Sequence, residues 1–133
     1  MGLATQTDGV SIAIARDPAL VRTARLVAAA VARRADRPDT VIEAVRLAVG
    51  EACAVMIGVD EPTIPLDPAE RVEVTLRSDR SGFSVTVSGS IADPDPSFEG
   101  IDLDPWALLR GISDELTISA EGAVTTVRMS WPG

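Results

Sequence analysis

A run of apolar residues at helical spacing after Asp39 is the strongest constraint on what this chain can fold into. One stripe is made of Ile42, Val45, Val49, Cys53 and Met56. A second stripe is made of Ala44, Leu47, Ala48, Glu51 and Val55. Spacings of three and four residues place each set on one side of an α-helix. Because both stripes are largely apolar, the pattern predicts a helix buried between two layers.

Alternating apolar residues before this region predict a β-strand, carried by Val10, Ile12 and Ile14. Asp17-Pro18 then combines a good N-cap residue with a proline that suits the first helical turn. A first helix is therefore expected here. Its predicted buried stripe is Leu20, Ala24, Val27 and Val31.

The second half of the chain predicts a hairpin, an acidic segment, a short helix and two further strands. The apolar residues of the hairpin strands are Val72, Val74, Leu76, Phe83, Val85 and Val87, with a turn at residues 77–82. Residues 88–104 show no periodicity and contain acidic but no basic side chains. Such a segment is either a solvated loop or a surface for a basic partner helix. The short helix starts at Pro105-Trp106, and the last strands lie at residues 116–118 and 127–131.

The predicted order is therefore β-α-α-β-β-loop-α-β-β. Hairpins dominate this order, so we expect an α+β two-layer sandwich, with a mostly antiparallel sheet and helices on one face. Residues 1–9 are polar and are expected to form a flexible N-terminal segment, followed by a single domain at residues 10–133. No apolar run approaches the roughly 20 residues needed to span a bilayer, and no signal peptide is recognisable. A cytoplasmic location is expected.

Missing residue types exclude several kinds of chemistry. The chain has no His, Lys, Tyr or Asn, and its single cysteine is Cys53. These absences exclude a Ser-His-Asp triad, a P-loop lysine, a Schiff base, a structural zinc site and an internal disulfide. The net charge of −8 disfavours nucleic acid and anionic membranes as partners and attracts a basic protein. Cys53 itself lies on the core stripe and is expected to be a small buried hydrophobe.

Three segments resemble one known family. Residues 45–55, Val-Arg-Leu-Ala-Val-Gly-Glu-Ala-Cys-Ala-Val, resemble the N-box helix of the RsbW-type anti-sigma-factor serine kinases. These kinases belong to the GHKL ATPases, together with histidine kinases, gyrase and Hsp90. Residues 108–116 resemble the helix after the ATP lid, and residues 125–129 resemble the closing strand. The resemblance extends from about Val10 to Trp131 and implies the Bergerat, or histidine-kinase-like ATPase, fold.

The same resemblance implies a degenerate ATP site. It places the family's general base at Glu51, but Val55 stands where an asparagine holds magnesium, and a valine cannot ligate a hard cation. Ser88 stands at the position of the adenine-binding aspartate, and residues 103–105 with Trp106 replace the Gly-x-Gly phosphate cradle. We therefore expect no cofactor and no metal. ATP and magnesium belong only to the alternative in which the protein is an active kinase.

Two of these positions carry alternative interpretations. Glu51 is either a relic of an active site or one half of a structural ion pair with an arginine. Trp106 either fills the space of an adenine or caps the core.

The resemblance implies an anti-sigma factor that sequesters a sigma factor and is released by a STAS anti-anti-sigma protein. An arginine on the first helix contacts the sigma factor in this family, and the match places it at Arg22, with Arg25 nearby; a solvated helix face is the alternative. A homodimer is also implied. The alternatives for the whole protein are an active serine kinase acting on a STAS protein, and a non-catalytic dimerisation or scaffold module.

Overall fold

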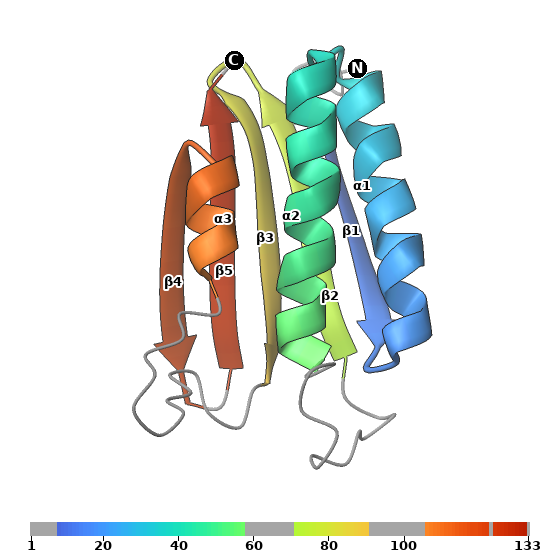
Figure 1. The fold of residues 1–133 in the computed structure, drawn as a ribbon, viewed down its shortest axis with the longest axis vertical. Helices are drawn as coiled ribbons and strands as arrows, with labels where there is room; N and C mark the ends of the chain where they lie inside the picture. The colour runs from blue at the N-terminus through green and yellow to red at the C-terminus, as the bar shows by residue number, and fades with distance from the viewer. Residues whose placement is uncertain (1–7, 58–70, 91–105, 123, 133) are drawn as a thin grey trace, which may run out of the picture.

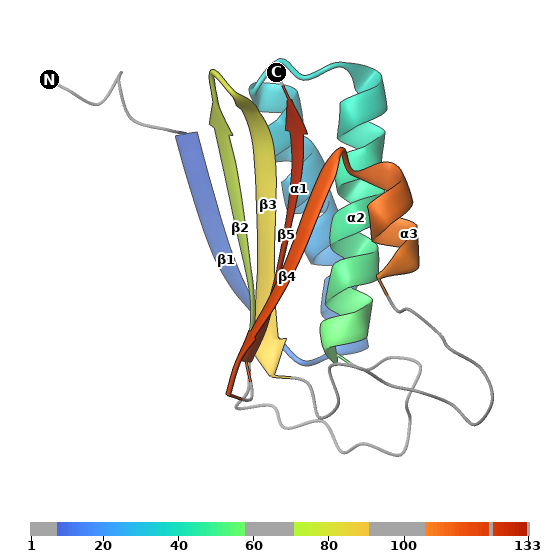
Figure 2. The ribbon, with the colours of Figure 1, turned by 90° about the vertical axis from the view of Figure 1, so that its left-hand side faces the viewer.

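The computed structural model describes residues 8–57, 71–90, 106–122 and 124–132. The elements are β1 (Asp8–Ala15), a 3-10 turn (Pro18–Leu20), α1 (Val21–Arg34), α2 (Asp39–Ile57), β2 (Arg71–Asp79), β3 (Gly82–Ser90), α3 (Ala107–Ile112), β4 (Glu115–Glu121) and β5 (Val124–Pro132). The strands form one antiparallel sheet in the order β1-β2-β3-β5-β4. All three helices lie on the same face of this sheet (Figures 1 and 2). The predicted α+β two-layer architecture is confirmed.

The core lies between the sheet and the helices. Every second residue of β2 and β3 is fully buried, which is the period expected of a strand with one covered face. The buried strand residues include Val72, Val74, Leu76, Phe83, Val85, Val87, Val127, Met129 and Trp131. The other face of the sheet carries mainly serine, threonine and charged residues, and no described helix covers it.

Helix α1 buries a different stripe from the one that the sequence predicts. Its buried residues are Ala24, Ala28, Ala29 and Ala32. Leu20, Val27 and Val31 are only partly buried, so of the predicted stripe only Ala24 is correct. Small alanine side chains let α1 pack closely against α2, and the larger residues are left at the margin of the interface.

Helix α2 covers the sheet but is not enclosed between two layers. All five residues of its first predicted stripe are buried, as expected. Of its second stripe, only Ala48 is fully buried, and Leu47 is 42% exposed. Within the described residues, helix α1 covers this side of α2 only in part and no second layer encloses it, so the predicted burial between two layers is wrong. The predicted character of Cys53 is confirmed, because its burial raises the pKa of the thiol to about 12.

Several strand boundaries differ from the predicted ones. The β2–β3 turn is shorter than residues 77–82, because the two strands pair as far as Asp79 and Gly82. Residues 88–90 belong to β3, so the segment without periodicity begins after them; its remainder, residues 91–104, lies outside the described residues. Residues 8 and 9 belong to β1, although they were expected in the flexible segment.

Two arginines connect the helices to the sheet. Arg16, at the end of β1, donates from Nη2 to the carbonyl of Ile57 at 3.2 Å, where a cation also meets the negative end of the α2 dipole. Arg37, between α1 and α2, donates from Nη2 to Ser78 Oγ at 3.0 Å and to the Asp79 carbonyl at 3.1 Å. These contacts anchor opposite ends of α2 to the sheet.

The Asp79 carboxylate organises the β2–β3 turn. It accepts from the Ser81 hydroxyl, from the Ser81 N–H at 2.8 Å and from the Gly82 N–H at 3.2 Å. Gly82 has φ 144°, a value that favours glycine. The Ser81 hydroxyl, followed by the backbone N–H groups, lowers the pKa of Asp79.

We expect Asp79→Ala to lower the thermal unfolding midpoint at pH 7. Because the folded-state pKa of Asp79 lies below the unfolded value, the ionised carboxylate stabilises the fold above the unfolded pKa, about 4. This stabilisation is lost as pH falls through the folded pKa, so the difference between variant and wild type should shrink there. Circular dichroism melts between pH 7 and pH 2.5 measure it. Glu73→Ala, which removes an exposed carboxylate from the same strand, should show no comparable pH dependence.

Candidate functional site

Glu51 lies in the second half of α2, and its side chain is half-buried. Among the described residues, no arginine forms an ion pair with it and no group hydrogen bonds to its carboxylate. The described ion pair on this helix joins Arg46 Nη2 to Glu43 Oε2 at 2.7 Å, one turn or more earlier. Within the described residues, the structure therefore gives no support to the structural ion pair that the sequence left open for Glu51.

Val55 follows Glu51 by one helical turn, so the two side chains lie on neighbouring parts of α2. Its side chain is also half-buried. The resemblance expects a magnesium ligand at this position, and a valine offers only methyl groups in place of an oxygen ligand. No cluster of three or more His, Cys, Asp or Glu residues that could hold a metal ion occurs in the part of the chain that the structure describes.

The structure separates Ser88 from the residues on α2. Ser88 pairs with Glu73 of β2 and Thr126 of β5. Its neighbour Val87 is buried against the helices, so the alternation of the strand directs Ser88 to the uncovered face of the sheet. Ser88 therefore lies on the opposite side of the sheet from α2, which carries Glu51.

Gly89 is the residue of β3 that faces α2 at this level, and the sequence analysis did not identify it. A Cβ atom built at Gly89 would lie 3.5 Å from Met56 Sδ and 3.5 Å from Val72 Cγ2. Both neighbours are fully buried, so α2 packs directly onto the strand at this point. The alternation through Phe83 to Val87, extended by one step, could have identified Gly89.

Trp106 is 3% exposed and precedes α3 in the hydrophobic core, where Leu109 is also buried. This placement agrees with a residue that caps the core; filling the space of an adenine stays a prediction. A second tryptophan holds the other end of α3, because Trp131 Nε1 donates to the Ile112 carbonyl at 2.9 Å. Residues 103–105, which replace the expected phosphate cradle, lie outside the described residues.

Among the described residues, the position at which the resemblance expects a magnesium ligand is Val55, which carries only methyl groups, and Met56 packs against the strand at Gly89. Phosphoryl transfer depends on positioning and on charge stabilisation by the metal. A carboxylate at Glu51 supplies neither.

Arg22 and Arg25 are both exposed on α1. Arg25 extends toward α2, where its aliphatic carbons lie over Gly50. A hollow of about 250 Å³ adjoins it, lined by Arg25, Glu43, Ala44, Arg46 and Leu47. The sequence analysis missed this hollow because it assigned Leu47 to a buried stripe. We call these five lining residues the α1–α2 groove.

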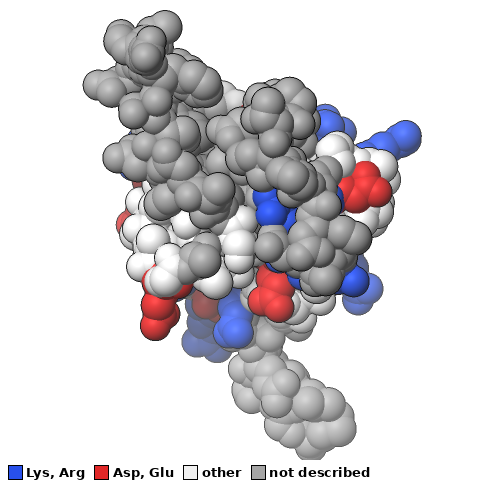
Figure 3. Space-filling view, turned by 90° about the horizontal axis from the view of Figure 1, so that it is seen from below, with Lys and Arg blue, Asp and Glu red and all other residues white. Residues whose placement is uncertain are grey.

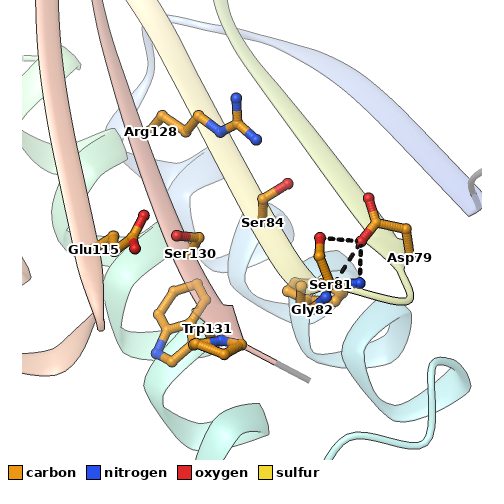
Figure 4. Close-up of a pocket in the computed structure, with 10 residues that line it drawn as sticks. Asp79, Ser81, Gly82, Ser84, Glu115, Arg128, Ser130 and Trp131 are labelled. Atoms are coloured by element: carbon orange, nitrogen blue, oxygen red, sulfur yellow. Dashed lines mark hydrogen bonds between the residues drawn. The ribbon is translucent and has the colours of Figure 1, made fainter.

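A second hollow of about 250 Å³ lies on the uncovered face of the sheet near the β2–β3 turn. Figure 4 shows the Arg128 guanidinium over β3, beside Ser84 and Ser130, with Glu115 on one side and the hydrogen-bonded Asp79 on the other. Opposite charges thus share one shallow polar surface. None of the residues that the sequence analysis selected for function lines it.

Because Glu51 has no described partner, Glu51→Gln should change the free energy of unfolding by no more than about 0.5 kcal/mol. Urea denaturation followed by tryptophan fluorescence measures it. Met56→Ala, which removes a fully buried side chain from the same helix, should cost about 2–5 kcal/mol in the same assay. If Glu51→Gln lowered the free energy of unfolding by more than about 1 kcal/mol, Glu51 would instead be one half of a structural ion pair.

Comparison with known families agrees with this architecture. The family model of the histidine kinase-like ATPase domain matches residues 14–131, which extend from the end of β1 into β5. No curated protein sequence matches the chain. Within the described residues, no helix is both long enough and apolar enough to cross a membrane.

Proposed function

The chain belongs to the histidine kinase-like ATPase domain family, and from this we propose that it is an RsbW-type anti-sigma factor that does not phosphorylate its antagonist. In this proposal the protein sequesters a sigma factor by direct binding. A STAS anti-anti-sigma protein competes for the same surface and releases the sigma factor. The protein acts as a homodimer in the cytoplasm.

The observation that carries the non-catalytic part of the proposal is the half-buried valine at position 55, where the resemblance expects the asparagine that holds magnesium. Without an oxygen ligand at this position, the triphosphate loses the metal that neutralises its charge during transfer. Regulation then depends on exchange of partners.

The observation that supports the partner surface is the charge of α1. This helix carries four arginines and no acidic residue, whereas the whole chain has a net charge of −8. Arginine side chains project on the side of the molecule where α1 lies (Figure 3). A local basic surface on an acidic protein favours an acidic partner segment and steers its approach. Arg22 and Arg25 are the residues that we assign to the sigma factor.

An active serine kinase is the second candidate, and the presence of Glu51 is the observation that favours it. A general base at this position would activate the serine hydroxyl of a STAS protein. This candidate requires bound ATP and magnesium, so nucleotide binding separates the two proposals.

Calorimetric titration with ATP and magnesium should give no heat of binding, and millimolar nucleotide should leave the thermal unfolding midpoint unchanged. The physical reason is the missing metal ligand at Val55. Labelled ATP should transfer no phosphate to a STAS protein from the same organism. Micromolar binding with phosphate transfer that Glu51→Gln abolishes would instead establish the kinase.

Affinity capture with each purified sigma factor of the source organism should identify one that the protein binds. Arg22→Glu and Arg25→Glu should each weaken this binding at least tenfold, about 1.4 kcal/mol, because each replaces an attraction by a repulsion. Arg80→Glu, which reverses an exposed charge in the β2–β3 turn, should leave the affinity unchanged. If no sigma factor binds, or if all three variants weaken binding equally, the proposed function is wrong.

A further inference from the structure

A glycine occupies the middle of α2, where it has no role in ending the helix. Gly50 lies inside a 19-residue helix, Asp39–Ile57. Glycine is the poorest helix former after proline, so its presence at such a position calls for a packing reason. The structure shows one at this position.

Gly50 leaves the space that the side chain of Arg25 occupies. A Cβ atom at Gly50 would lie 2.8 Å from Arg25 Cδ, 3.1 Å from Cγ and 3.3 Å from Nε. The first distance is shorter than real contacts allow, so any larger residue at this position displaces the arginine. The stem of Arg25 thus lies against α2 at Gly50, across the junction of the two helices.

We propose that Gly50 is a positioning residue for Arg25, and that the α1–α2 groove it completes binds an acidic amphipathic helix of a protein partner. The proposal deepens the proposed function and rests on it, because Arg25 belongs to the surface assigned to the sigma factor. It adds the second helix to that surface and states the chemistry of the segment that docks there.

The chemistry of the groove selects this partner. Leu47 and Ala44 supply an apolar floor, and Leu47 is 42% exposed. Arg25 and Arg46 supply two guanidinium groups at its margin. Glu43 already forms an ion pair with Arg46 at 2.7 Å, which leaves Arg25 as the cation for an incoming carboxylate. An amphipathic helix with leucines on one side and glutamates beside them complements both features.

The first test measures the position of Arg25 without any partner. In ¹⁵N-labelled protein, the Nε–Hε resonance of Arg25 is assigned by its loss in Arg25→Ala. Gly50→Ala should shift this resonance and leave most of the other arginine resonances unchanged. Gly111→Ala is the matched control, because a Cβ at this helical glycine would meet nothing within 4 Å. In every variant the Cys53 thiol should stay unreactive toward a thiol reagent at pH 8, which shows that the core is intact.

The second test measures binding with a defined probe, a synthetic 16-residue amphipathic helix of glutamate and leucine. Titration should shift the resonances of Arg25 and Leu47 until they saturate. A peptide with lysine in place of each glutamate should not bind. Gly50→Ala should weaken the acidic peptide about fivefold, whereas Gly111→Ala should not. In the Arg25→Ala background, Gly50→Ala should have no further effect, because it acts through the arginine.

These outcomes separate the inference from the proposed function. The inference is overturned if Gly50→Ala leaves the Arg25 resonance in place, if it weakens binding equally with and without Arg25, or if the lysine peptide binds as well as the acidic one. None of these measurements uses a sigma factor. Failure of sigma-factor capture with the expected peptide results would overturn the proposed function alone.

Discussion

The packing of α2 onto the central strands is the contact on which the rest of the structure depends. One side of this helix, with Val45, Val49 and Met56, is fully buried against the sheet. Residues have fixed angular positions around a helix axis, so burying one side of α2 also determines where its other side chains lie. Glu51 and Val55 are held at half-buried positions, and Gly50 is turned toward α1. The motif positions and the α1–α2 groove are therefore consequences of one hydrophobic interface.

Periodicity predicted the elements correctly because one covered face leaves a clear signal in each of them. It predicted all five buried residues of the first α2 stripe and the alternation of β2 and β3. It was wrong where burial depends on a neighbouring helix. Alanines face the core on α1, and their small size gives a weak hydrophobic signal beside Val27 and Val31. Leu47 was predicted to be buried because it is a large apolar residue at helical spacing. The same pattern arises from an exposed leucine, and only the arrangement of the layers distinguishes the two.

The candidate site shows the same limit in another form. Glu51 and Val55 follow from a short motif, and the sequence was sufficient to place both residues on one helix. The face on which Ser88 lies depends on the alternation of a strand that continues to Ser90, and the sequence analysis did not extend the strand that far. The contact between Arg25 and Gly50 joins two helices whose relative rotation is set by tertiary packing. No spacing within either helix contains that information.

If phosphoryl transfer is absent, as we propose, no irreversible step drives the exchange of partners. The distribution of the sigma factor between polymerase, this protein and its antagonist is then set by concentrations and dissociation constants. A tenfold change in any one of those constants corresponds to about 1.4 kcal/mol, which is comparable to a single charge-assisted hydrogen bond. An arginine held in a fixed position loses less conformational entropy on binding than a free one. In this proposal, the cost of a glycine in the middle of α2 is offset by the affinity that a fixed Arg25 contributes to the exchange.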